Sequence, residues 1–309
     1  MTDRAARRKY WNRNRDFYYM LLPVVGFYLL FRYGPMWGVL MAFQDYNIFK
    51  GIPGSRWVGL EVFREVLGNQ GFWRAFGNTL RLNLLDLLVG FPAPILFALL
   101  LNEVTSEGMK RTFQSISYLP HFVSWVVVYG LVVDLFGGDT GLFNLLLGRL
   151  GLGQTGFLTQ PSWWLAVYVG SSVWKDVGWG AILYLSALTA IDPQLYEACS
   201  MDGAGRFKQT LHVTLPGISA TICILLILRV GHMLTTGFEA PFLMGNGMVS
   251  NVSRVLAVYI YEVGVVGARY SYTTAAGVFL SLGNLILLLL ADWGTKRLGG
   301  TGFFGGSGA

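Results

Sequence analysis

Four side chains around residue 175 interrupt an otherwise apolar run and could bind a polar ligand. Ser172, Asp176 and Trp179 recur at the i, i+4, i+7 spacing of one helix face, and Lys175 lies beside them. Ionisable groups in such a segment usually face a cavity or a partner, because burying them alone is costly. Aromatic faces stack on pyranose rings, while hydroxyl, carboxylate and ammonium groups bind sugar hydroxyls. The spacing therefore indicates a sugar-binding face. The alternative is that the charges pair with neighbouring helices and the aromatic residues form interfacial belts.

Two further apolar segments carry polar and aromatic residues at helical spacing: His121, Trp125 and Tyr129 on one face, and Arg229, His232 and Met233 on another. With Lys175 and Arg229 as fixed cations and His232 as a titratable group, Asp176 is the obvious anion. If these groups line one cavity, its potential favours an acidic oligosaccharide, and Arg229 could hold a uronate carboxylate through two hydrogen bonds. The alternative is a neutral site in which Asp176 pairs with Lys175 or Arg229 at a packing interface.

A polar stretch at residues 190–216 separates two apolar segments and predicts a short helix followed by a turn. Asp192 and Pro193 form a favourable helix start, with Asp as the N-cap and Pro at the first helical position. Gly203 allows a turn that a side chain would strain. A second short helix over about 204–212 is expected to end before the next apolar segment begins at Leu215-Pro216.

The first of these two short helices has a surface suited to docking. Glu197 presents one carboxylate, and small side chains let the helix enter a cleft: Ala198, Cys199 and, just after the turn, Ala204. An ordinary amphipathic loop at the membrane surface is the alternative interpretation, and the spacing alone does not exclude it.

The elements that position these residues are long and apolar. Of the 309 residues, 53% are hydrophobic and 13% charged, and the mean hydropathy is +0.50; soluble domains carry about 25% charged residues. Six runs reach the roughly 20 residues that a helix needs to cross a membrane, and helices satisfy their own backbone there. They cover about 17–43, 79–101, 115–137, 163–189, 217–237 and 271–292. The sequence thus predicts an all-α membrane protein with six transmembrane helices.

Lys and Arg set the expected orientation. With six spans, the basic segment 1–16, two loops and the C-terminal tail carry twelve of these residues on one side, against seven on the other. Both termini are therefore expected in the cytoplasm. The net charge of +6 indicates topology and contact with anionic lipid, not nucleic-acid binding. Residues 17–298 are expected to form one transmembrane domain, and the last eleven residues, 299–309, hold six Gly and predict a flexible tail.

Motifs for catalysis and nucleotide binding are missing from the sequence. No Gly-x-x-x-x-Gly-Lys-Ser/Thr run occurs, so the chain cannot bind ATP in the P-loop manner. With three His, no His-Glu-x-x-His and no Gly-x-Ser-x-Gly, a membrane-embedded hydrolase is a poor interpretation, and no bound cofactor is expected. Cys199 lies in a loop and Cys223 inside a span, so no disulfide is expected.

The polar stretch resembles a motif of the permease subunits of binding-protein-dependent ABC importers. The motif reads Glu-Ala-Ala, three residues, Gly, nine residues, Ile-x-Leu-Pro; the chain matches it at Glu197, Ala198, Gly203, Val213, Leu215 and Pro216. Cys199 replaces the second Ala and Val213 replaces Ile. The text Tyr33-Gly34-Pro35-Met36-Trp37-Gly38, followed by Ala42-Phe43-Gln44-Asp45-Tyr46, is similar to the oligosaccharide group, and more narrowly to permeases related to the larger maltose permease subunit.

The resemblance implies a type I ABC importer permease fold in the bacterial cytoplasmic (inner) membrane, and import of an oligosaccharide. It implies a second, similar permease in a heterodimer, two ATPase subunits that bind ATP and Mg, and an extracytoplasmic solute-binding protein. In this family the polar loop is the coupling helix, and its Glu pairs with a basic residue of the ATPase groove. The coupling residues carried over are Glu197, Ala198, Cys199, Asp202, Gly203, Ala204, Leu215 and Pro216. In maltose-type permeases the third, fourth and fifth spans hold the sugar.

A secondary transporter of a polar solute is the main alternative, since it also needs polar groups at the middle of the membrane. It would need no coupling loop, and its transport would not depend on ATPase subunits.

Overall fold

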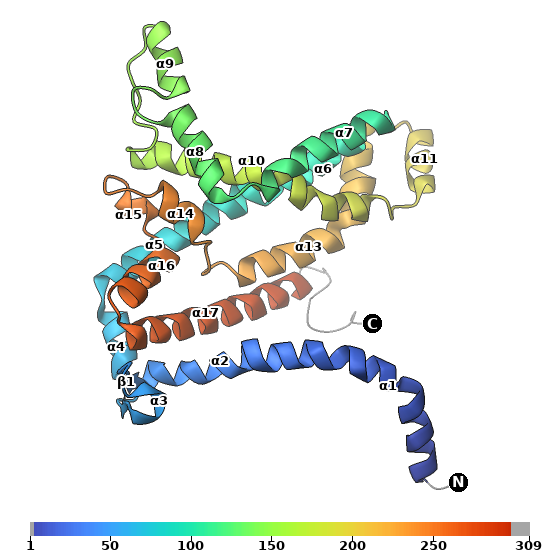
Figure 1. Ribbon diagram of the computed structural model, residues 1–309. Coiled ribbons are helices and arrows are strands. Elements are labelled where there is room, and N and C mark those ends of the chain that lie inside the picture. Colours follow the sequence, from blue (N-terminus) through green and yellow to red (C-terminus); the bar gives the residue numbers. More distant parts are fainter. Residues whose placement is uncertain (1–2, 298–309) are drawn as a thin grey trace. The chain divides into compact units, whose positions relative to one another are not determined.

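The computed structural model describes residues 3–297, and this part of the chain is mostly helical (Figure 1). It falls into two compact units. The first takes the described residues up to Gly68 together with Val263–Val278, and the second takes Asn69–Glu262 and the described residues from Phe279 onward. The flexible tail expected at 299–309 lies outside the described residues.

The first unit begins with a long helix and contains a small hairpin. Helix α1 continues through a π-helical turn, Leu29–Tyr33, and a 3-10 helix, Trp37–Phe43, so that Arg13–Phe43 forms one apolar stretch. Its helices and strands are α1 (Asp3–Tyr28), α2 (Gly34–Met36), β1 (Gln44–Asp45), α3 (Gly51–Gly54), β2 (Arg56–Trp57) and α4 (Glu61–Gly68). The strands pair antiparallel, with Gln44 opposite Trp57.

The second unit contains the remaining helices, the last of which, α17, starts in the first unit. They are α5 (Gln70–Leu85), α6 (Pro92–Asn102), α7 (Glu107–Tyr118), α8 (Trp125–Phe136), α9 (Leu142–Arg149), α10 (Pro161–Leu188), α11 (Pro193–Met201), α12 (Arg206–Gln209), α13 (Leu215–Gly231), α14 (Glu239–Met244), α15 (Ser250–Ser253), α16 (Leu256–Ile260) and α17 (Tyr270–Arg297). A π-helical turn, Asp86–Gly90, joins α5 to α6.

Four helices among the described residues are long and apolar enough to cross a membrane: Arg13–Phe43, Gln70–Asn102, Arg206–Gly231 and Tyr270–Arg297. A fifth span results if Glu107–Phe122 and Trp125–Phe136 are counted together. Helix α10 has the length, with 28 residues, but polar residues occupy its middle. Helical architecture is confirmed, whereas length and composition alone do not give the expected count of six.

The third predicted span, 115–137, is wrong as a single helix. The chain bends by 101° between Glu107–Phe122 and Trp125–Phe136. Pro120 lacks the N–H that would continue α7, and the Ser124 side chain accepts from Val127 N at 3.4 Å, which starts a new helix. His121 and Trp125 therefore do not share a helix face.

The start and end of the fifth predicted span, 217–237, also need correction. The short helix does not end before Leu215-Pro216, because Arg206–Gly231 runs as one helix through a π-helical turn at Thr210–Thr214. This wider turn accommodates Pro216, which has no N–H to donate. The helix then ends at Gly231, so His232 caps it and Met233 lies beyond it, and the expected shared face with Arg229 is not formed.

Helix α10 packs against several helices of the second unit, among them α6, α7 and α13. Small residues on α10 let two of these helices approach closely. Gly178 faces the backbone of Ser117 in α7, and Gly180 faces Pro94 in α6, so that an added Cβ would clash at either position. The same helix buries Trp164, whose indole N–H donates to the carbonyl of Met244 at 2.8 Å. This packing fixes α10 against its neighbours and so fixes the positions of its polar residues, Ser172, Lys175 and Asp176.

Candidate functional site

The predicted short helix at residues 193–201 is present as α11. The side chain of Asp192 accepts from Gln194 N at 2.9 Å, and Pro193 is the first helical residue. Gly203 has a φ of +77°, a conformation that favours glycine. The local geometry expected from Asp-Pro and Gly is therefore confirmed, and Figure 1 shows α11 far from α9 in the second unit.

Within residues 190–216, called the coupling segment after its predicted role, side-chain contacts join α11 to the start of the long helix Arg206–Gly231. Gln209 Nε2 donates to Ser200 Oγ at 2.8 Å, and the hydroxyls of Tyr196 and Thr214 lie 3.1 Å apart. Glu197 is exposed. Of the other coupling residues, four are exposed and three half-buried: Ala198, Asp202, Gly203 and Pro216, then Cys199, Ala204 and Leu215. The contacts thus join α11 to the helix that begins at Arg206, and they leave the Glu197 carboxylate exposed.

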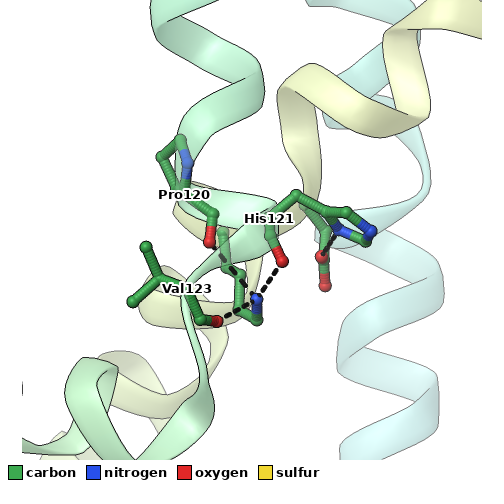
Figure 2. A network of polar contacts seen from close by, with 5 residues as sticks. Pro120, His121 and Val123 are labelled. Carbon is green, nitrogen blue, oxygen red and sulfur yellow. Dashed lines mark hydrogen bonds and ion pairs between the residues drawn. The ribbon is translucent and has the colours of Figure 1, made fainter.

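The side chain of Lys175, a residue of α10, reaches into the break between α7 and α8 and does not line either cavity described below. Its side chain is 7% exposed, and its Nζ donates to the carbonyls of Pro120, His121 and Val123 at 3.2, 2.6 and 2.7 Å (Figure 2). The expectation that Lys175 contributes a cation to a substrate cavity is therefore wrong. The bend exposes carbonyls that a straight helix would satisfy, and the ammonium satisfies them instead.

His121 connects this break to a cavity. Its Nδ1 lies 2.8 Å from Asp176 Oδ1 and, as an N–H, donates to it. Its ring stacks on Trp179, with centroids 4.6 Å apart and planes 1° from parallel. The alternative of a neutral site, in which Asp176 pairs with Lys175 or Arg229, is not what the structure has, because Asp176 accepts from His121 and orients its imidazole.

Arg229 has a different partner. It forms an ion pair with Asp86, which lies in the π-helical turn Asp86–Gly90 between α5 and α6. The Arg229 side chain is 50% exposed and that of Asp86 23%. The guanidinium therefore keeps donors free while Asp86 holds it in place.

Two cavities meet at these residues. One has a volume of about 460 Å³ and extends toward the α11 end, past Pro94, Tyr184 and Leu225; we call it the α11-side cavity. The other, about 550 Å³, extends toward Phe238 and Glu239 and is called the α14-side cavity. Both are lined by the same four polar residues: Asp86, Ser172, Asp176 and Arg229. These four residues are therefore the part of the lining that the two cavities share.

Most of the predicted path residues line these cavities. The α11-side cavity includes His121, Trp179 and His232, and the α14-side cavity includes Trp125. Met233 lines a smaller space of about 40 Å³ with Asn83, Arg229 and His232. Tyr129 is wrong as a path residue, because it packs half-buried against the hydrophobic core around Trp164.

The sequence interpretation missed several cavity residues. Asp86 is one of them, and its partner is Arg229, far along the chain. The signal available was an unpaired acid in one span and an unpaired base in another. Asn83, Thr235, Thr236 and Glu239 also line these spaces, and their ordinary polar character gave no sign of it.

The turn after α13 is held by two amide side chains. Asn83 Nδ2 donates to the Met233 carbonyl at 2.9 Å and to Thr236 Oγ1 at 2.7 Å. Asn284 Oδ1 accepts from Leu234 N at 3.0 Å, and its Nδ2 donates to Thr235 Oγ1 at 2.7 Å.

In residues 3–297, no group of three His, Cys, Asp or Glu side chains is arranged to hold a metal ion.

Comparison with known proteins matches this chain over most of its length. A family model described as "Binding-protein-dependent transport system inner membrane component" matches residues 90–300. Protein LplB of Bacillus subtilis is 44% identical over 292 residues, covering 94% of this chain and 92% of that one. The polygalacturonan/rhamnogalacturonan transport system permease protein YteP of the same organism is 44% identical over 287 residues, covering 93% and 89%.

Solved structures agree with this result. A chain of a bacterial alginate ABC transporter, in complex with an alginate pentasaccharide-bound periplasmic protein, is 41% identical with a TM-score of 0.87. The match covers 95% of this chain and 98% of that one. A second structure, of a bacterial ABC transporter that imports the acidic polysaccharide alginate, is also 41% identical, covering 94% and 98%, with a TM-score of 0.86.

Proposed function

This chain belongs to the family of binding-protein-dependent transport system inner membrane components, and we propose that the cargo it passes across the membrane is an acidic oligosaccharide. It is a permease subunit of an ABC importer, so the secondary-transporter alternative is set aside. The observation that carries the proposal is the similarity, above 40% identity over nearly the whole chain, to permeases for galacturonan and alginate.

The cavity lining supports the proposal through one residue, not through its overall charge. With Lys175 buried in the break, the fixed charges on the two cavities are Arg229 against Asp86, Asp176 and Glu239. A general positive potential is therefore not the basis of selection. Arg229, half exposed and oriented by Asp86, can donate two parallel hydrogen bonds to one uronate carboxylate.

The remaining lining suits the neutral parts of a sugar. His121 and Trp179 stack on each other at the cavity wall, and the aromatic face of Trp179 that His121 leaves uncovered could stack on a pyranose ring, while Ser172 offers a hydroxyl. In the α14-side cavity, Thr235 and Thr236 add hydroxyl groups near Trp125. A chain of sugar units could thus meet aromatic and polar groups in turn as it moves.

Transport by this mechanism needs partners. We propose that the coupling segment docks on one of two ATPase subunits that bind ATP and Mg, with Glu197 facing a basic residue there. A second, similar permease completes the path, and an extracytoplasmic solute-binding protein delivers the sugar. We also propose that both termini lie in the cytoplasm of a bacterium. In a Cys-free background, labelling should find Arg206→Cys inside and Arg149→Cys outside, and reversed accessibility contradicts this topology.

The cargo is tested by uptake into proteoliposomes that contain the whole transporter. Acidic and neutral oligosaccharides of equal length are compared for the wild type and Arg229→Gln. The wild type should prefer the acidic sugar, and Arg229→Gln should lose that preference, because a neutral amide replaces the guanidinium. Arg81→Gln is the matched control, since Arg81 is exposed and lines neither cavity. Preference of the wild type for the neutral sugar contradicts the proposal.

A further inference from the structure

The break between α7 and α8 creates a local shortage of hydrogen-bond donors. Helix α7 ends at Tyr118, a 3-10 turn follows at Leu119–Phe122, and Val123 is extended, with φ −77° and ψ 133°. Val123 N donates to the Pro120 carbonyl at 3.1 Å, but the bend interrupts the regular helical ladder. In the apolar interior of a membrane no water replaces the missing donors, so the carbonyls need partners within the protein.

Lys175 of α10 supplies these donors. An ammonium group has three N–H bonds and no acceptor, and here it meets three carbonyls, those of Pro120, His121 and Val123 (Figure 2). The charge faces carbonyl dipoles and the ring of Trp125, whose centroid is 5.9 Å from Nζ. Three N–H donors match the three carbonyls at the break. In a straight helix backbone N–H groups would satisfy these carbonyls, and the ammonium would have no such acceptors.

The contacts made by α10 converge on one residue of the break, His121. Lys175 holds its carbonyl, Asp176 holds its Nδ1, and Trp179 stacks on its ring. Asp176 and Trp179 line the α11-side cavity with His121, whereas Lys175 does not line it. One turn of α10 therefore fixes the backbone, the ring orientation and the ring position of a cavity residue.

We propose that Lys175 is a positioning residue for transport. Its ammonium fixes the bend between α7 and α8 and thereby places His121 against Trp179 in the α11-side cavity. The inference rests on the proposed function in taking this cavity as part of the substrate path. It makes the positive charge of Lys175 necessary, since a side chain of similar size without N–H donors cannot satisfy three carbonyls.

Chemical rescue tests the need for the ammonium. In a background with Cys199→Ser and Cys223→Ser, whose own uptake is the reference because Cys199 is a predicted coupling residue, Lys175→Cys should lower uptake by about tenfold, the effect of losing a charge-assisted hydrogen bond. Reaction with 2-aminoethyl methanethiosulfonate, which rebuilds an ammonium at this position, should restore uptake. Methyl methanethiosulfonate adds bulk without charge and should not. Lys110→Cys, treated in the same way, is the control, since Lys110 lies in α7 away from the break.

Distance measurements test the bend independently of transport. Spin labels at Met109 and Leu131, exposed positions on α7 and α8, report the angle between the two helices. We expect one narrow interspin distance with Lys175 and a broadened or shifted distribution in Lys175→Met, compared at equal recovery of the assembled transporter.

Three outcomes would overturn the proposal: an unchanged distance distribution in Lys175→Met, full uptake by that variant, or rescue by the methyl reagent equal to rescue by the aminoethyl reagent. Failure of the acidic-cargo proposal is seen separately, as a wild-type preference for the neutral sugar. Uptake and rescue would then be measured with that sugar, while the distance measurement needs no substrate, so the two failures remain distinguishable.

Discussion

The coupling segment and the break between α7 and α8 both interrupt apolar helices, but their stabilising partners lie at very different distances along the chain. In the coupling segment, Asp192 bonds Gln194, two residues away, and Gln209 bonds Ser200, nine away. In the break, the donor is Lys175, 52 to 55 residues from its acceptors. The first shape is encoded locally and the second depends on tertiary packing, so substitutions should separate coupling from substrate binding.

The largest effect is expected from Glu197→Lys. The change replaces the exposed carboxylate of α11 by a cation, which would repel a basic docking groove. Uptake should be abolished, while the cavities and membrane insertion stay intact. The measurements are co-purification of the ATPase subunits and ATP-driven uptake. Gln194→Lys also adds one lysine to this helix but keeps the Glu197 carboxylate, and it should retain most of the uptake. Wild-type uptake by Glu197→Lys would contradict the assignment of Glu197 as the coupling carboxylate.

A strong but incomplete loss is expected from Gly203→Val. Gly203 has a φ of +77°, where a β-branched residue is strained by about 1–3 kcal/mol. Gly205→Val is a matched control, because Gly205 has a φ of −72° and both positions have open space around an added Cβ. Uptake per ATP hydrolysed should fall only in the first variant. Equal loss in both would show that side-chain volume, not backbone conformation, matters here.

This contrast also explains what could be predicted from the sequence. Asp192, Pro193 and Gly203 act on their neighbours, so α11 and its turn were predictable. The bend at Pro120 was not, because a proline in an apolar run can kink, break or merely start a helix, and the outcome depends on Lys175. The role of Lys175 was not predictable for the same reason, because its acceptors lie 52 to 55 residues away.

The cavity was predictable only in part. The spacing of Ser172, Asp176 and Trp179 on one helix gave the right face, since 3.6 residues per turn fix it. The pairing of Asp86 with Arg229 joins two spans, and helical periodicity says nothing about which spans meet. The resemblance implied the partners and an oligosaccharide cargo, whereas the acidic character was inferred from charges of which one, that of Lys175, does not line either cavity.

A moderate effect is expected from Trp179→Ala. Trp179 and Trp174 lie on the same helix and are 46% and 48% exposed, but only Trp179 lines the α11-side cavity. Loss of a stacking surface should raise the KM for the sugar about tenfold, equivalent to ~1.4 kcal/mol. Trp174→Ala should change KM little. If both variants change KM equally, the effect comes from helix packing, and the assignment of Trp179 as a stacking surface for the sugar is wrong.

The smallest effect is expected at the turn that follows α13, residues 232–237. This turn is held by neutral amides, whereas the break between α7 and α8 is held by the charged Lys175, so the two can be compared. Asn83 and Asn284 hold this turn with neutral amides, each worth about 0.5–1.5 kcal/mol per hydrogen bond. Because the two amides bond different groups of the turn, either single change to Ala leaves the other contact in place. Asn83→Ala and Asn284→Ala should therefore each lower uptake only about two- to threefold, and the double variant should lose more than either. Uptake and thermal stability are measured beside Lys175→Met. If Asn83→Ala alone loses as much uptake as Lys175→Met, the charge at position 175 does not distinguish the α7–α8 break from the turn at residues 232–237. Any donor from a distant part of the chain would then be enough to hold a turn that lines a cavity.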